Sequence, residues 1–115
     1  MNWLKELYLG EKAEQKAKKL VRAAVRGKKG PNDGCFLITL SSFPKGQLDL
    51  LRFSDTRKKS VDTAKLTVVG LAADQAEAFA LVEKMANDCV KATGGAELKA
   101  YLSGRETVDW RGVRL

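Results

Sequence analysis

The chain has 115 residues, of which 44% are hydrophobic and 30% are charged, and its net charge at pH 7 is +7. This length suits one domain with a sizeable core, and the apolar content is too high for intrinsic disorder. The sequence contains no histidine, so the commonest general base and metal ligand is missing, and its two cysteines cannot form a structural zinc site alone. We therefore expect no metal site, no cofactor and no catalytic residue.

The positive charge is concentrated in the N-terminal half. Residues 1–60 contain 14 Lys and Arg against 6 Asp and Glu, whereas residues 61–115 contain 7 against 8. Such an asymmetry bears on partners and association rather than on fold. It is the one feature of the sequence that hints at an activity.

The N-terminus and the apolar runs predict a soluble protein of the cytoplasm. The first residues include an acidic one, Glu6, and lack the apolar run of a secretory signal. The longest apolar stretch, residues 68–73, is far shorter than the ~20 residues of a membrane-spanning helix. Cys35 and Cys89 lie in apolar segments, so we expect two reduced, buried thiols; a disulfide or a reactive thiol is the alternative.

A basic helix is predicted near the N-terminus. Residues 11–26 are rich in strong helix formers, and their apolar side chains recur at helical spacing. This stripe consists of Ala13, Ala17, Leu20, Val21 and Ala24. Residues 2–9 predict a shorter helix ahead of it, on similar grounds. Its apolar side chains are Trp3, Leu4, Leu7 and Tyr8.

An antiparallel sheet is predicted for the middle of the chain. Residues 35–40 are typical of a buried strand, and residues 47–53 form a second strand after a type I turn at 43–46. The third strand is at residues 65–71. The polar segment 54–63 between them is short for a parallel crossover, so a meander is the expected topology. Residues 97–102 are a candidate fourth strand.

A long second helix is predicted from Asp74 to residue 93. Asp74 and Glu77 have the spacing of a capping box, and Gly94 is placed for a left-handed C-terminal cap. The fold class is therefore α+β: an N-terminal basic amphipathic helix, a small, mainly antiparallel sheet of three to four strands, and the long helix packed on one face.

The single domain, 1–115, divides into an N-terminal helical segment at 1–33, the sheet with the long helix at 34–102, and a tail at 103–115. Four apolar side chains of the tail share one face if Gly112 forms a bulge. These are Val108, Trp110, Val113 and Leu115. With helices on one face of the sheet only, the tail or a second copy would cover the other face, so self-association into a homodimer is a hypothesis.

The basic helix carries the candidate binding residues. Four of its cations fall within an arc of about 80° opposite the apolar stripe, and two more follow in the next loop. These six are Lys12, Lys19, Arg22, Arg26, Lys28 and Lys29. Clustered cations suit a nucleic-acid backbone or an acidic protein. The alternative is that they bind no partner and form the solvent-exposed face of an amphipathic helix.

Two other motifs have simpler explanations. The segment Gly27-Lys28-Lys29-Gly30 resembles the GxxG loop of KH domains, but that loop joins two helices and a turn follows here. Residues 69–74 lead from a strand into a helix N-terminus, where anions bind in some proteins. They lack the glycine pattern of a nucleotide-binding loop, and Asp74 would repel a phosphate.

Six short segments carry a resemblance to known proteins. They are Leu9-Gly10-Glu11, Leu37-Ile38-Thr39-Leu40-Ser41, Leu48-Asp49, Val69-Gly70-Leu71-Ala72, Glu77-Ala78 and Thr93-Gly94. Through these caps, strands and turns, residues 9–102 resemble a family of small bacterial proteins of unknown function. The resemblance implies a compact α/β domain and no activity, and it does not extend to the tail.

These observations predict a small, soluble intracellular binding or interaction module without catalytic activity. The first alternative is nucleic-acid binding through the basic helix. The second is an enzyme that uses Lys, Tyr or carboxylate groups, which would require a concave pocket where such groups converge with perturbed pKa values.

Overall fold

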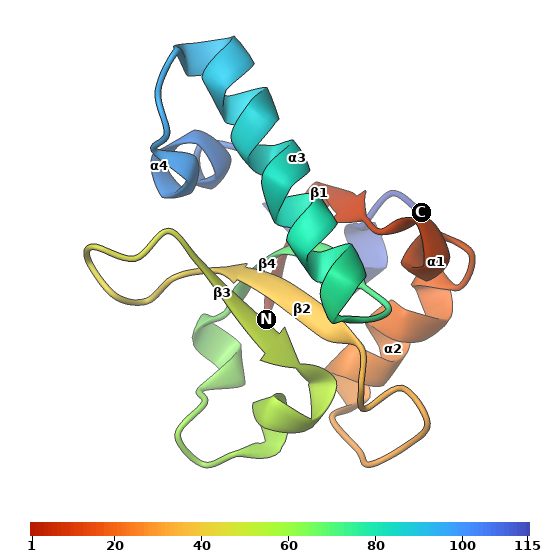
Figure 1. The fold of residues 1–115 in the computed structure, drawn as a ribbon. Helices are drawn as coiled ribbons and strands as arrows, with labels where there is room; N and C mark the ends of the chain where they lie inside the picture. Colours follow the sequence, from red (N-terminus) through yellow and green to blue (C-terminus); the bar gives the residue numbers. More distant parts are fainter.

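A computed structural model describes all 115 residues, and its centre is a five-stranded sheet with the strand order β3-β2-β4-β1-β5 (Figure 1). The strands are β1 (Asn2–Leu9), β2 (Phe36–Leu40), β3 (Leu48–Arg52), β4 (Thr67–Ala72) and β5 (Thr107–Val108). β1 and β4 are parallel, and the other three pairings are antiparallel. The predicted α+β class is confirmed, with one parallel pair and more strands than expected.

Helices cover both faces of the sheet. α3 (Gln75–Thr93) and α4 (Leu98–Ser103) lie on one face, and Figure 1 shows α3 crossing over the sheet with α4 beside it. α1 (Glu11–Glu14) and α2 (Ala17–Arg26) lie on the other. Three short 3-10 helices complete the structure. They are η1 (Phe53–Arg57), η2 (Thr63–Lys65) and η3 (Trp110–Gly112).

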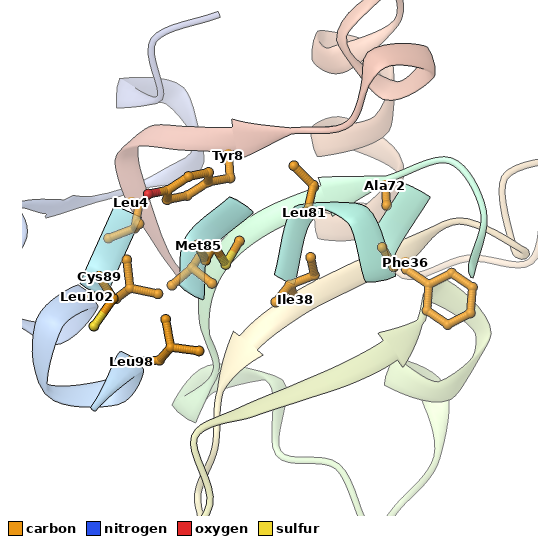
Figure 2. Packing of buried hydrophobic residues seen from close by; sticks show 12 residues of the cluster. Leu4, Tyr8, Phe36, Ile38, Ala72, Leu81, Met85, Cys89, Leu98 and Leu102 are labelled. Atoms are coloured by element: carbon orange, nitrogen blue, oxygen red, sulfur yellow. The ribbon is translucent and has the colours of Figure 1, made fainter. Parts of the chain in front are cut away.

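The sheet separates two apolar clusters. The α3-side cluster contains 12 buried residues, shown in Figure 2, and the α2-side cluster contains 10. Neighbouring residues of one strand go to different clusters: Ile38 to the α3 side and Leu37 to the α2 side. Because both faces are covered, β2 and β4 are apolar nearly throughout instead of alternating with polar residues. None of the helices has the length together with the apolar composition that a membrane-spanning helix needs.

The prediction of a helix at residues 2–9 is wrong, because this segment is strand β1. In a strand, side chains point alternately to the two faces. Leu4 and Tyr8 belong to the α3-side cluster, whereas Trp3 belongs to the α2-side cluster and Leu7 packs against both. An apolar pattern at positions 3, 4, 7 and 8 therefore fits a strand buried on both faces as well as it fits a helix.

The predicted helix at residues 11–26 is broken in the structure. α1 ends at Glu14, the chain turns at Gln15 and Lys16, and α2 begins at Ala17. The apolar stripe is nevertheless confirmed, since all five of its residues are buried. The turn changes the direction of the chain while keeping Ala13 and the stripe of α2 against the sheet.

Two expectations about the sheet are also wrong. A meander would place β4 beside β3. Instead, β4 pairs with β2, the first strand of the hairpin, so that β2 lies between β3 and β4. Residues 97–102 fall mainly in helix α4. Leu98 and Leu102 are both buried, and this spacing of four residues is helical.

Other predicted features are confirmed. The hairpin turn closes with a hydrogen bond from the Gly46 N–H to the Phe43 carbonyl oxygen, at 3.0 Å. Asp74 caps α3 by accepting a hydrogen bond from the Glu77 N–H at 2.9 Å, and Gly94 ends the helix in the left-handed conformation, with φ 75°. Cys35 and Cys89 are buried and unpaired.

The tail packs on its own chain. Val108 of β5 pairs with Trp3 of β1, and the Arg114 N–H donates to the Lys5 carbonyl oxygen at 2.9 Å. Trp110 and Val113 pack against the α2-side cluster. Gly112 lies in η3 instead of forming a bulge. The sheet face opposite α3, which we expected the tail or a second copy to cover, is covered mainly by α2.

The carboxylate of Glu77 joins the two helical layers. β1 and β4 are parallel neighbours, so α1 and α3 begin at the same edge of the sheet. α1 has no cap of its own at Gly10. Glu77 instead accepts hydrogen bonds from the N–H groups of Lys12 at 2.9 Å, Ala13 at 3.0 Å and Ala73 at 3.1 Å. A side chain at Gly10 would overlap this carboxyl group.

We expect Glu77→Ala to lower the free energy of unfolding by about 3 kcal/mol, because three backbone N–H groups lose a charged acceptor. Gly10→Ala should cost a similar amount by displacing that carboxylate. In the Glu77→Ala background the same glycine substitution should cost less than about 1 kcal/mol. Denaturant unfolding of the four proteins measures this coupling.

Gly104→Ala is the matched control, since nothing lies near the added methyl group. It should leave the free energy of unfolding within about 0.5 kcal/mol of the original value. Additive effects of Gly10→Ala and Glu77→Ala would contradict the role given to Glu77.

Candidate functional site

A hollow of about 650 Å³ lies beside the C-terminal part of α2, and basic side chains surround it. We call it the basic hollow. Its walls come from α2, from the loop at 27–34 and from η1. Seven cations line it: Lys18, Lys19, Arg22, Arg26, Lys28, Lys29 and Arg57. None of the three other main hollows is lined by so many cations.

The local sequence explains how these cations meet. α2 buries Leu20, Val21 and Ala24 against the sheet, so the charged residues between them face solvent. At the end of α2, Gly27 takes the left-handed conformation with φ 67°, which L side chains rarely adopt. The chain then turns sharply, and the two lysines of the loop return to the same hollow as the helix.

The hollow has one carboxylate, and that carboxylate is paired. The Arg57 guanidinium donates to both oxygens of Asp33, at 3.0 and 2.8 Å. This contact holds the pKa of Asp33 below its usual value. Asp33 also accepts a hydrogen bond from the Gly30 N–H at 3.3 Å, which helps to shape the loop. The remaining six cations of the hollow form no ion pair.

The structure brings together five of the six candidate binding residues. The five are Lys19, Arg22, Arg26, Lys28 and Lys29. Lys12 is separated from them, because the turn after α1 takes it out of the arc of α2. Its Nζ lies 3.1 Å from an Asp74 carboxylate oxygen, and this hydrogen bond raises the pKa of Lys12.

Two cations of the hollow were not among the six candidate binding residues. Lys18 lies on α2 itself, at the margin of the predicted arc. Arg57 comes from η1, more than thirty residues along the chain, and only the tertiary fold places it beside α2. The sequence signal for Arg57 was the basic run of Arg57, Lys58 and Lys59 in a polar segment.

A second group of polar side chains converges between β1, α3 and α4. The Tyr8 hydroxyl donates to an Asp88 carboxylate oxygen at 2.8 Å, and the Arg105 guanidinium donates to the Tyr101 hydroxyl at 2.6 Å. Arg105 also lies over both aromatic rings. Burial, together with the hydrogen bond to Asp88, raises the pKa of Tyr8 to about 12.

This cluster is suited to holding elements together. A general base works best with a pKa near the ambient pH, whereas Tyr8 keeps its proton far above neutral pH. Its contacts instead link three elements that cover the α3-side cluster. Burial likewise raises the pKa of the Cys35 thiol, so it stays protonated and unreactive. No group of three Cys, Asp or Glu side chains is arranged to hold a metal ion.

Comparisons of the chain with protein-family models, with curated proteins and with solved structures found no match in any of the three.

We expect Tyr8 to ionise at a pKa of about 12 in the folded chain, and Asp88→Asn to move that pKa towards the ordinary value of about 10. Asparagine removes the negative charge that favours the neutral phenol. A spectrophotometric titration of phenolate absorbance measures this, with Tyr8→Phe identifying the signal of Tyr101.

The same shift predicts alkaline stability. Because the pKa of Tyr8 is higher in the folded chain than in the unfolded one, its contribution to stability is complete below about pH 10. It is lost as the pH rises from about 10 to about 12. Tyr8→Phe should remove this component, and an unchanged alkaline profile in that variant would contradict the assignment.

Proposed function

We propose that this chain is a small binding module that holds the phosphate backbone of a nucleic acid in the basic hollow. The observation that carries the proposal is that six cations without an ion-pair partner surround one concave surface. Binding of clustered cations to a phosphate backbone is favoured by the release of condensed counterions. Arginine adds planar, bidentate recognition of phosphate oxygens.

The charge pattern of α2 argues against a merely solvated face. Arg26, Lys28 and Lys29 lie near the C-terminus of the helix, where its dipole favours cations. The helix dipole therefore explains these three cations without a ligand. It does not explain Lys18 and Lys19, which lie in the first turn of α2, where the dipole disfavours cations.

Repulsion along the helix supports the same conclusion. Lys18 and Arg22, and Arg22 and Arg26, are like-charge pairs four residues apart, and Lys19 and Arg22 are three apart. Such pairs destabilise a helix by about 0.2–0.5 kcal/mol each. If these residues only kept the outer face of the helix soluble, a mixture of acidic and basic side chains would do so without this repulsion. A bound polyanion relieves the repulsion, which gives the arrangement a physical reason.

An acidic protein is the competing partner. Its carboxylates are single charges on mobile side chains, whereas a phosphate backbone presents a regular row of charge. Half of the residues that line the hollow are basic and only two, Ala23 and Phe53, are hydrophobic, whereas the core of a protein interface is built on apolar and aromatic side chains. We therefore favour the nucleic acid.

Charge reversal at Lys19→Glu with Arg22→Glu should weaken binding to unrelated DNA or RNA sequences by similar factors. It should also flatten the plot of log K against log salt by about 1.4 to 1.8. Fluorescence anisotropy over a range of salt concentrations measures both. Because repulsion along α2 is removed, the free energy of unfolding should not fall.

The matched control is Lys45→Glu with Lys91→Glu, which changes the net charge equally at exposed sites outside the hollow. It should leave most of the affinity intact. If the two double variants lost the same amount of affinity, the loss would be due to the change in net charge and not to the basic hollow. Equal affinity for poly-glutamate and for an oligonucleotide of the same charge would overturn the preference for phosphate.

Asp33→Asn should strengthen binding, because it removes the one carboxylate of the hollow and releases Arg57 to contact phosphate. The salt slope should steepen by up to about 1 if Arg57 then makes a contact. The lost ion pair is partly exposed, so its removal should change the stability little. Weaker binding by this variant would mean that the pair holds the loop in its active shape.

A further inference from the structure

The tail forms a second hollow that adjoins the first. This tail hollow, of about 470 Å³, lies between α2 and the segment that follows β5. Lys18 and Arg22 line both hollows, so the two form one continuous basic surface. The tail adds Arg111 and a partly exposed aromatic side chain, Trp110, whereas Phe53, the aromatic residue that lines the basic hollow, is buried.

Trp110 is held firmly in this position. Its 3-10 turn is capped by Asp109, which accepts a hydrogen bond from the Arg111 N–H at 3.0 Å. The preceding strand β5 is paired with β1. Trp110 packs against the α2-side cluster while remaining partly exposed in the tail hollow. The indole is thus a fixed platform and not a mobile side chain.

The charges around Trp110 suit an anionic, flat ligand. The Arg111 guanidinium lies over the indole ring, 5.1 Å from its centroid, and neither it nor Lys18 nor Arg22 forms an ion pair. Arg114 is engaged with Glu6 at 3.1 Å and contributes less. The tail hollow is lined by no Asp or Glu side chain.

We infer that the nucleic acid is single-stranded, with its phosphates along the basic hollow and one of its bases stacked on Trp110 in the tail hollow. The inference rests on the proposed function. Single strands expose the flat faces of their bases, and stacking on an aromatic side chain is a common, sequence-tolerant source of affinity. In a duplex those faces are covered by neighbouring base pairs. The base replaces the Arg111 guanidinium on the indole, and Arg111 then stacks on the base or contacts a phosphate.

The apolar tail residues that suggested self-association lie mainly against their own chain. Val108, Trp110 and Val113 are partly buried within their own chain, whereas Leu115, the fourth residue of that set, is exposed. Three of the four side chains that were expected to face a second copy therefore make contacts within their own chain. A homodimer formed through the tail becomes an outcome of the experiment below.

The experiment titrates the full chain with oligo(dT), with an abasic oligonucleotide of the same length and with a duplex of that length. Oligo(dT) should bind about 5- to 150-fold more tightly than the abasic strand, the range expected for stacking of one base. It should also bind more tightly than the duplex. Only oligo(dT) should quench the exposed part of the tryptophan fluorescence, since Trp3 is fully buried.

Two substitutions isolate stacking from packing. Trp110→Leu keeps an apolar side chain against the cluster but cannot stack, so its affinity for oligo(dT) should fall to that for the abasic strand. Trp110→Phe should restore much of the difference. If Trp110→Leu fails to fold, the comparison of the two strands in the original protein decides the matter.

The outcomes separate the two proposals. Equal binding of oligo(dT) and the abasic strand, or tighter binding of the duplex, would overturn stacking while leaving phosphate binding intact. No salt-sensitive binding of any oligonucleotide would overturn both. A dimer that dissociates on Trp110→Leu, with nucleic-acid affinity unchanged, would assign the tail to self-association instead.

Discussion

The position of the basic surface depends on the hydrogen bonds of one carboxylate. α1 has only four residues, too few to be stable alone, and no side chain next to it caps its N-terminus. Glu77, at the start of α3, supplies the missing acceptor and so ties the first turn of one layer to the first turn of the other. Gly10 is required there because only a residue without a side chain allows the two to meet.

This junction also explains why the edge of the sheet is not itself a ligand site. Two helix N-termini lie side by side after the parallel strands, an arrangement that attracts anions in many α/β proteins. Here Asp74 and Glu77 occupy both termini with the protein's own carboxylates. Lys12 forms an ion pair with Asp74 at the same junction. The remaining cations are left free on the far side of the turn, where α2 begins.

Beyond the turn, burial of a narrow apolar stripe determines which way the charges of α2 point. The buried residues of α2 are Ala17, Leu20, Val21 and Ala24, so its charged side chains lie on the opposite, outer face. The loop after Gly27, together with η1 and the tail, then surrounds the outer face of the helix. A surface that would be convex on an isolated helix becomes concave. Because the cations surround a concave surface, their fields add up within it and attract a polyanion more strongly.

Local features were well predicted wherever neighbouring residues decide the structure. The cap at Asp74, the left-handed glycine at the end of α3, the turn at the β2–β3 hairpin and the stripe of α2 depend on contacts a few residues apart. Five of the seven cations of the basic hollow were predicted for the same reason, since they share one helix and its adjoining loop.

Other features depended on contacts between distant parts of the chain. The segment at residues 2–9 has an apolar pattern that suits a helix or a strand buried on both faces, and only the presence of helices on both faces decides for the strand. The sequence by itself determined the α+β class, the amphipathic α2 and the excess of charge on it, because these follow from local propensity and spacing. The tertiary structure alone decided that Lys12 leaves the basic surface while Arg57 and Trp110 join it, because hydrogen bonds and strand pairing across the fold place them there.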